Sequence, residues 1–296
     1  MTDLWDGVVR LRTATLAELA SLHGGHVRGE GAVPLGRFVP VMTAQAGDLA
    51  PVVSGRFVAA AVLARARGAS LLITEELSKD PRLANVDGWV HPDASLAMAD
   101  VLEARATVPD LPATLGPGTV VGPHAVLHPR VRIGARVHIG ASCVIGAAGF
   151  GWVPGEDGLP RAVPQLGGVI IEDDVYLGAL STIDAGTLSP TIIRRGAKLD
   201  AHVHVGHNSV IGEAAIVAAQ VGFAGSVTVG RGVRIGGQAG IADHVTLGDG
   251  ARVAARSGVI GDVPAGVVVA GYPAVPRMRW LRAFARLYKL LPEDPT

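Results

Sequence analysis

The sequence predicts a mainly β chain. A parallel β-helix over residues 113–273 is expected between a small α/β domain at 1–107 and a C-terminal helical segment at 274–296. The evidence is a repeat: from Leu115 to Ala270 nearly every sixth residue is aliphatic, and a small residue such as Gly116 usually follows it. A period of six fits neither an α-helix nor one long strand, and is typical of a solenoid whose hexads each form a short strand and a corner. Three hexads would close one triangular coil of about 18 residues, stacked about 4.8 Å from the next.

Composition limits the possible functions. The 296 residues include 26 basic and 26 acidic side chains, so the formal charge of zero gives no support for nucleic-acid binding. The single cysteine, Cys143, falls at an inward hexad position, which predicts a buried thiol rather than a nucleophile. Neither a signal-like N-terminal segment nor a run of about twenty apolar residues occurs, so we expect a cytoplasmic protein without a membrane span.

The first 107 residues lack the hexad and predict an α/β domain. Thr15, followed three residues later by Glu18, forms the pattern of a helix-capping box. The expected elements are a helix at Leu16–Leu22, an Ala-rich helix at Phe57–Arg67, a buried strand at Ala69–Thr74 and a linker at Val108–Pro112.

Two further segments depart from the hexad. Residues 147–169 break it with Gly, Pro, Trp152 and charged residues, so we expect a loop excursion, and long loops on rigid scaffolds often carry function. Residues 276–291 have the period of an amphipathic helix. Its apolar side holds Leu281, Phe284, Leu287 or Tyr288, and Leu291, and its basic side holds Arg279, Arg282, Arg286 and Lys289.

The densest polar cluster lies between Asp200 and Asn208. Its histidines are His202, His204 and His207, at hexad positions four, six and three. All three should face outward, because aliphatic residues fill the inward positions. His244 falls on the equivalent corner two coils later, about 10 Å along the axis. An outward imidazole that is neutral near pH 7 can act as general base toward an alcohol or amine. A solvated surface cluster, a subunit contact and a zinc site are the alternative interpretations.

Several motifs resemble the UDP-3-O-acylglucosamine N-acyltransferase family of lipid A biosynthesis, within the hexapeptide-repeat acyltransferases. They occur in that family's order and near its spacing, over almost the whole chain. They are Ala44-Gln-Ala-Gly-Asp-Leu49, Gly149-Phe-Gly-Trp152, Pro164-Gln-Leu-Gly-Gly168, Thr182-Ile-Asp184, Lys198-Leu-Asp200, His207-Asn208, Gln220-Val-Gly-Phe-Ala-Gly225 and Gly236-Gly-Gln-Ala-Gly-Ile-Ala242. The resemblance implies that the β-helix is left-handed and that the N-terminal domain binds uridine.

The resemblance also implies roles for individual residues. His207 would take a proton from a glucosamine 2-amine as it attacks an acyl thioester, and His244 would be the second active-site histidine. The expected substrate-binding residues are Asn208, Asp200, His204, Phe57 and Gln165. The donor would be a hydroxyacyl chain on acyl carrier protein, which brings its own phosphopantetheine, so we expect no resident cofactor or metal. A homotrimer is expected, because a neighbouring subunit would supply the wall that one thin coil lacks.

The basic side of the C-terminal helix is a candidate docking surface for the acidic carrier protein. Gly271-Tyr-Pro-Ala274, just before it, resembles the element that closes the coil beside the pantetheine groove in hexapeptide acyltransferases. No acidic residue occurs between Arg277 and Leu291. The alternative is a solvated face on a helix that packs through Leu281, Phe284 and Leu287.

Three departures from the family concern substrate recognition. Pro51 stands where an aromatic residue would stack on uracil, Ser54 replaces an Asn, and Ala185 replaces an Arg. A related acyltransferase with another acceptor, or with acyl-CoA as donor, therefore stays open as an alternative. A metal-dependent hydratase and a non-catalytic scaffold are the alternatives from other classes.

Overall fold

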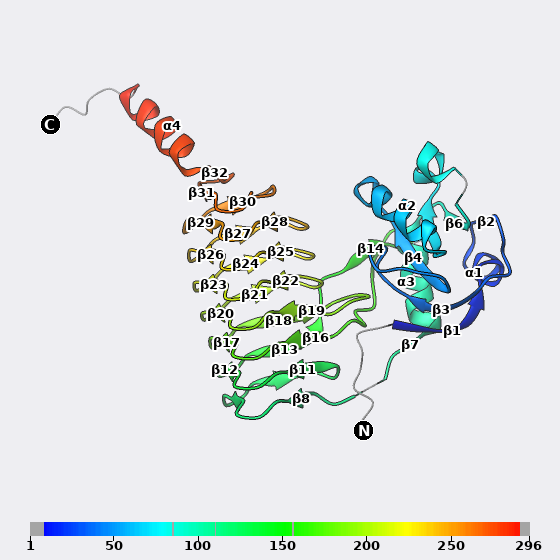
Figure 1. The fold of residues 1–296 in the computed structure, drawn as a ribbon, viewed down its shortest axis with the longest axis horizontal. Coiled ribbons are helices and arrows are strands. Elements are labelled where there is room, and N and C mark those ends of the chain that lie inside the picture. The colour runs from blue at the N-terminus through cyan, green and yellow to red at the C-terminus, as the bar shows by residue number, and fades with distance from the viewer. Residues whose placement is uncertain (1–8, 85, 110, 156, 291–296) are drawn as a thin grey trace. The chain divides into compact units, whose positions relative to one another are not determined.

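The computed structural model describes residues 9–84, 86–109, 111–155 and 157–290 (Figure 1). They form two compact units. The first comprises Met1–Leu111, Phe150–Gly167 and Gly186–Ser189, and the second comprises Pro112–Gly149, Gly168–Ala185 and Pro190–Thr296. Two inserted segments of the repeat region therefore fold with the N-terminal residues.

The first unit is built on a mixed seven-stranded sheet in the order β2-β6-β5-β4-β3-β1-β7. Its strands are β1 (Val9–Thr15), β2 (His26–Arg28), β3 (Pro34–Phe38), β4 (Asp48–Val52), β5 (Ser70–Thr74), β6 (Gly88–His91) and β7 (Ala106–Thr107). Its helices are α1 (Leu16–His23), α2 (Val58–Ala66) and α3 (Ala94–Arg105), with 3₁₀ turns η1 (Gly55–Phe57), η2 (Leu77–Lys79) and η3 (Pro81–Leu83). The predicted capping box is confirmed: the Glu18 amide donates to the Thr15 hydroxyl, and the Thr15 amide donates to the Glu18 carboxylate. The predicted helices and the buried strand are confirmed as well.

The excursion from the hexad is a folded element rather than an open loop. Within it, β14 (Trp152–Pro154) and β15 (Pro160–Ala162) form an antiparallel hairpin. Val153 and Val163 are buried in the same apolar core as residues of α3. Arg161 of β15 pairs with Asp100 and Glu103 of α3. Burial and charge pairing thus hold most of the excursion in place.

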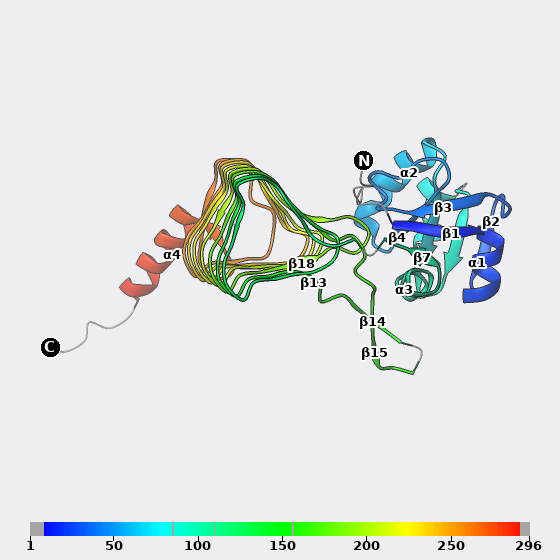
Figure 2. The ribbon, with the colours of Figure 1, turned by 90° about the horizontal axis from the view of Figure 1, so that it is seen from below.

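The second unit is a left-handed β-helix with a triangular cross-section (Figure 2). Each side is a parallel sheet with one short strand from each coil, apart from the last strand of the third side, β32, which is antiparallel. One side holds β8 (Thr114–Leu115), β11 (Val131–Ile133), β16 (Val169–Ile171), β19 (Thr191–Ile193), β22 (Val210–Ile211), β25 (Thr228–Val229) and β28 (Thr246–Leu247). A second side holds β10 (Val126–Leu127), β13 (Val144–Ala148), β18 (Thr182–Ala185), β21 (His204–Val205), β24 (Gly222–Phe223), β27 (Gly240–Ile241) and β30 (Gly258–Val259). The third holds β9 (Val120–Val121), β12 (His138–Ile139), β17 (Tyr176–Leu177), β20 (Lys198–Leu199), β23 (Ile216–Val217), β26 (Arg234–Ile235), β29 (Arg252–Val253), β31 (Val268–Ala270) and β32 (Val275–Pro276).

The inward residues are those that the hexad predicts. Cys143 is fully buried, and burial raises the pKa of its thiol, as expected for a structural cysteine. The first coil differs: Leu115 is 51% exposed and Val121 is 38% exposed. Both lie on terminal strands of their sheets, so another coil stacks on them from one side only.

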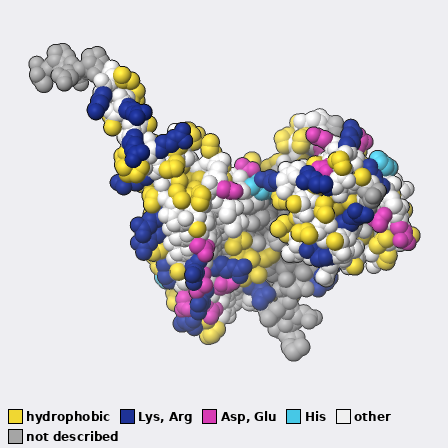
Figure 3. All heavy atoms as spheres, turned by 45° about the horizontal axis from the view of Figure 1, so that its top comes forward, with side chains coloured by type: hydrophobic (Ala, Val, Ile, Leu, Met, Phe, Trp, Pro, Cys, Tyr) yellow, Lys and Arg dark blue, Asp and Glu magenta, His cyan; other side chains and the backbone are white. Residues whose placement is uncertain are grey.

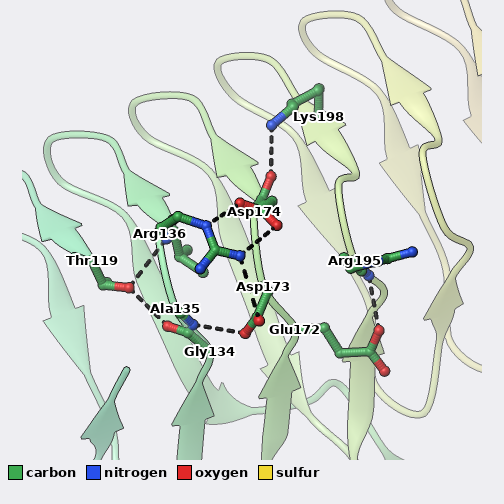
Figure 4. A network of polar contacts seen from close by, with 10 residues as sticks. Thr119, Gly134, Ala135, Arg136, Glu172, Asp173, Asp174, Arg195 and Lys198 are labelled. Atoms are coloured by element: carbon green, nitrogen blue, oxygen red, sulfur yellow. Dashed lines mark hydrogen bonds and ion pairs between the residues drawn. The ribbon is translucent and has the colours of Figure 1, made fainter. Parts of the chain in front are cut away.

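Polar ladders join successive coils at the corners. Figure 4 shows Arg136 reaching the next coil, where its guanidinium hydrogen-bonds Asp174 at 2.6 and 2.8 Å and lies 3.6 Å from Asp173. The hydrogen bond from Arg136 lowers the pKa of Asp174. Lys198 then donates to the Asp174 carbonyl at 2.6 Å. These contacts fix the register of the coils with charges that remain at the surface.

Helix α4 (Arg277–Lys289) follows the β-helix and buries none of its residues. Packing through Leu281, Phe284 and Leu287 is the alternative expectation, and within the single chain it is not met, because all three side chains are exposed. Leu291 lies outside the described residues. Basic and apolar side chains lie together along α4, without acidic ones (Figure 3). Among the residues that the structure describes, no helix is long and apolar enough to cross a membrane.

Candidate active site

His207 lies on the corner between β21 and β22, partly buried. Its ring sits between two glycines. A Cβ added at Gly225 would lie 2.6 Å from both Cε1 and Nε2 of His207, and one added at Gly149 would overlap the His207 Cβ. Gly149 directly follows β13, where the excursion leaves the coil, and Gly225 belongs to the coil after that of His207. The absence of side chains at both positions therefore makes room for the imidazole.

Hydrogen bonding fixes the tautomer of this imidazole. His207 Nδ1 lies 2.9 Å from the Asn208 side-chain oxygen, which can only accept. In the neutral ring Nδ1 must therefore carry the proton, and Nε2 keeps its lone pair. The backbone amide of Asn208 donates to the Thr191 hydroxyl at 2.9 Å, which ties the corner to strand β19.

A second imidazole lies on the adjacent sheet. His204 of β21 is paired directly with Thr182 of β18, and its Nδ1 lies 2.7 Å from the Thr182 hydroxyl. Its Nε2 lies 3.7 Å from the carboxylate of Asp184, also on β18. Burial raises the pKa of the Asp184 carboxyl, and the positive charges of protonated His204 and, to a lesser extent, His207 lower it.

His244 lies two coils beyond His207 on the same corner. The Ser226 amide donates to the His207 carbonyl, and the His244 amide donates to the Gly225 carbonyl, so these residues form successive steps of one stack. Asn208, Ser226 and His244 share the left-handed corner conformation, with φ of 60°, 61° and 59°. His244 therefore stacks in line with Asn208, one hexad position from His207. Two coils separate the two histidines by about 10 Å along the axis of the β-helix.

The other sequence-predicted residues lie elsewhere. Asp200 and His202 occupy the corner between β20 and β21, where the Asp200 carboxylate accepts from the Ala201 amide at 2.7 Å. Gln165 and Phe57 belong to the first unit. The buried Gln165 side chain donates to the Val163 carbonyl at 2.9 Å and accepts from Thr187 at 2.9 Å, so it joins the two inserted segments. Phe57 lies beneath the Arg56 guanidinium, 5.0 Å from its ring centroid.

Sequence reasoning did not select Asp184. The signal was a carboxylate at an outward position beside the inward Ile183, in the motif Thr182-Ile-Asp184. Coil stacking brings it to His204, although twenty positions separate them in the chain.

On the outer face of the sheet that contains β21, the positions that follow His204 in successive coils are all glycines. The next strands place Gly222, Gly240 and Gly258 in line with it. A Cβ at Gly222 or Gly240 would meet nothing within 4 Å, whereas one at Gly258 would collide with the Tyr272 ring. The strip from His204 to Gly258 spans three coil steps, about 14 Å. It is an unobstructed surface that begins beside the His207 corner and ends at the aromatic ring of Tyr272.

The fold and repeat comparisons define the class of this protein. The model "bacterial transferase hexapeptide (six repeats)" matches residues 112–147, and "hexapeptide repeat of succinyl-transferase" matches residues 168–206 and 226–260. The fold is similar to that of a UDP-N-acetylglucosamine acyltransferase from Campylobacter jejuni, with a TM-score of 0.50 and 21% identity over 62% of this chain and 75% of that chain. The protein is a hexapeptide-repeat acyltransferase on a left-handed β-helix.

Two relatives identify the family more closely. The UDP-3-O-acylglucosamine N-acyltransferase of Syntrophotalea carbinolica is 45% identical over 332 residues, which covers 94% of this chain and 93% of that protein. The protein of the same name from Christiangramia forsetii is 58% identical over 80 residues, or 27% of this chain and 24% of that protein. The chain belongs to the UDP-3-O-acylglucosamine N-acyltransferase family.

Proposed function

We propose that the chain transfers a hydroxyacyl group from acyl carrier protein to the amine of a UDP-linked acylated glucosamine, with His207 as general base. The observation that carries this proposal is the oriented imidazole: Nδ1 bonds to Asn208, so Nε2 keeps the lone pair that a base needs. Family membership supports the substrate class.

The chemistry follows from this orientation. The sugar amine attacks the thioester carbonyl, the N–C bond forms, and collapse of the tetrahedral intermediate breaks the C–S bond. The amine proton passes to His207 Nε2 and then to the departing thiolate. His244, about 10 Å away, would bind a part of the substrate remote from the amine. No resident cofactor is required, since the thioester arrives on the donor.

The bare glycine strip suits the donor. A phosphopantetheine arm is narrow and flexible, and the surface over Gly222 and Gly240 leaves room for an extended chain. Tyr272, whose ring covers Gly258, closes the strip in the Gly271–Ala274 segment. The arm would thus place its thioester beside the corner that carries His207.

A transfer assay tests the function. Purified protein is mixed with carrier proteins loaded with hydroxyacyl chains of several lengths and with UDP-linked amino sugars, and products are read by mass spectrometry. An N-acylated UDP-sugar is the expected product. Transfer from acyl-CoA alone would contradict the proposed donor. Transfer only to an amino sugar linked to another nucleotide would contradict the proposed acceptor. A cytoplasmic location stays a prediction.

The chain is expected to form a homotrimer. His207 and Asn208 are only partly buried in the single chain, and a facing wall from a neighbouring subunit would enclose the acceptor. Closed threefold symmetry provides three equivalent sites in this way. Light scattering at micromolar concentration should give three times the mass of one chain. A monomer that still transfers acyl groups would contradict the proposal that a neighbouring subunit completes the site.

Charge reversal on α4 tests carrier docking. Arg279, Arg282, Arg286 and Lys289 lie on a helix whose described residues include no acid. Exposed charges at an interface mainly raise association rates and are screened by salt. Arg282→Glu with Arg286→Glu should therefore raise KM for the acyl carrier protein and remove its salt dependence. Turnover with a short acyl-pantetheine donor should stay unchanged. An equal loss with both donors would make the helix structural.

Uridine recognition is expected to be weak. Pro51 lies in β4, paired with Leu72, and it offers no aromatic ring that could stack on a base. Stacking of a base on an aromatic residue contributes roughly 1–3 kcal/mol. Pro51→Phe should therefore bind UDP-sugar at least about tenfold more tightly by calorimetry, or about 1.4 kcal/mol. Pro51→Leu controls for apolar bulk. Equal affinity of wild type and Pro51→Phe would mean that Phe57 or another group already holds the base.

A further inference from the structure

A carboxylate outside the predicted set lies beside the catalytic corner. Asp184 follows the inward Ile183 on β18, and only 13% of its side chain is exposed. Ionised carboxylates are costly to bury unless charge or hydrogen bonds compensate. The positive groups that act on Asp184 are the imidazolium forms of His204 and His207, and the arrangement therefore couples one buried acid to two rings.

Two contacts of the His204 ring fix its position beside Asp184. Its ring lies between two β18 side chains, with Nδ1 at the Thr182 hydroxyl and Nε2 facing the Asp184 carboxylate at 3.7 Å. Because Thr182 and His204 are direct cross-strand partners, backbone pairing holds this geometry. His207 follows three residues later, on the next corner, and its positive charge when protonated acts on the same carboxylate more weakly than that of His204 does.

We propose that Asp184 is a positioning residue for the transfer: its carboxylate holds His204 and stabilises the imidazolium that forms when His207 takes the amine proton. This inference rests on the proposed function. Before proton transfer His207 is neutral, and afterwards it carries a positive charge that a nearby buried anion offsets. The stabilisation is therefore greater during the reaction than before it, as rate acceleration requires.

The pH dependence of folding stability should show whether Asp184 serves the reaction or only holds the fold together. Burial raises the folded-state pKa of Asp184 above its usual 3.8, so the folded state binds its proton more tightly than the unfolded state does. The contribution of Asp184 to the free energy of unfolding therefore falls as the pH rises from its unfolded-state pKa to its folded-state pKa. Above the folded-state pKa this destabilisation is complete. Asp184→Asn should then melt no lower than wild type at neutral pH. A residue kept for structure alone would give the opposite result.

The test combines a pH profile with a direct titration. In Asp184→Asn the imidazolium that forms during the transfer loses its counter-charge. The acid limb of kcat/KM should therefore move to lower pH, and plateau kcat should drop about tenfold, with KM for the sugar nearly unchanged. Asp243→Asn is the control, because this exposed carboxylate lies 3.9 Å from His244 and should leave the profile in place.

NMR titration of the imidazoles separates this inference from the proposed function. A lower His207 pKa in Asp184→Asn supports the coupling even if the enzyme uses another substrate, and an unchanged pKa overturns it. An active wild type with an unshifted profile in Asp184→Asn overturns the positioning role and leaves the function intact. If Asp184→Asn does not fold, the wild-type resonances of His204 and His207 should show a second inflection where Asp184 ionises. A single inflection overturns the proposal.

Discussion

Replacing His207 with alanine is expected to abolish most acyl transfer while the chain stays folded. Loss of a general base costs roughly 10²- to 10⁴-fold in rate. The imidazole occupies a gap between Gly149 and Gly225 at the surface of the β-helix, so its removal takes no side chain from the aliphatic core. The loss should appear in kcat, measured under conditions where chemistry limits turnover, with an unchanged melting temperature.

Two controls make this result specific. His26→Ala removes an exposed histidine from β2 of the first unit and should leave turnover unchanged. His244→Ala should affect sugar-nucleotide KM more than kcat, because His244 lies two coils from the base. Near wild-type turnover of His207→Ala, with a measured chemical step, would contradict the base assignment and direct attention to His204.

The hexad predicted the β-helix well because each repeat contains its own folding information. An aliphatic residue at every sixth position points inward once coils stack on both sides of it, and Ile145, Ile183 and Val205 are fully buried in this way. The sequence could not predict the fate of residues 147–169 in the same way. Their hairpin is held by long-range pairing of Arg161 with α3, which no local pattern encodes.

Site residues could be predicted from the sequence where the hexad count runs without interruption. They could not be predicted where an insertion lies between residues that coil stacking brings together. His207 and His244 could be placed on one corner by counting hexads. Asp200 lies only seven positions before His207, but a hexad is one side of the triangle, so the two occupy different corners. Asp184 is farther away in sequence and nearer to the imidazoles, because the insertion Gly186–Ser189 obscures the coil spacing.

Gly225→Ala is expected to reduce transfer roughly 100-fold without unfolding the chain. A methyl group at this position would lie 2.6 Å from Cε1 and Nε2 of His207, which is closer than van der Waals contact allows. The neighbour is the free end of a side chain, so the ring can turn away at little cost to the backbone. Its displacement moves the basic nitrogen, and a misplacement of about 1 Å can cost 10²-fold in rate.

The matched control for Gly225→Ala is Gly261→Ala, where an added Cβ would meet nothing within 4 Å. This variant should keep both activity and melting temperature. Gly149→Ala approaches His207 from the opposite side and meets its Cβ, which cannot rotate away, so it should lose stability as well as activity. Full activity of Gly225→Ala would mean that turnover does not depend on the position of the His207 ring, and the cradle formed by the two glycines would have no catalytic role.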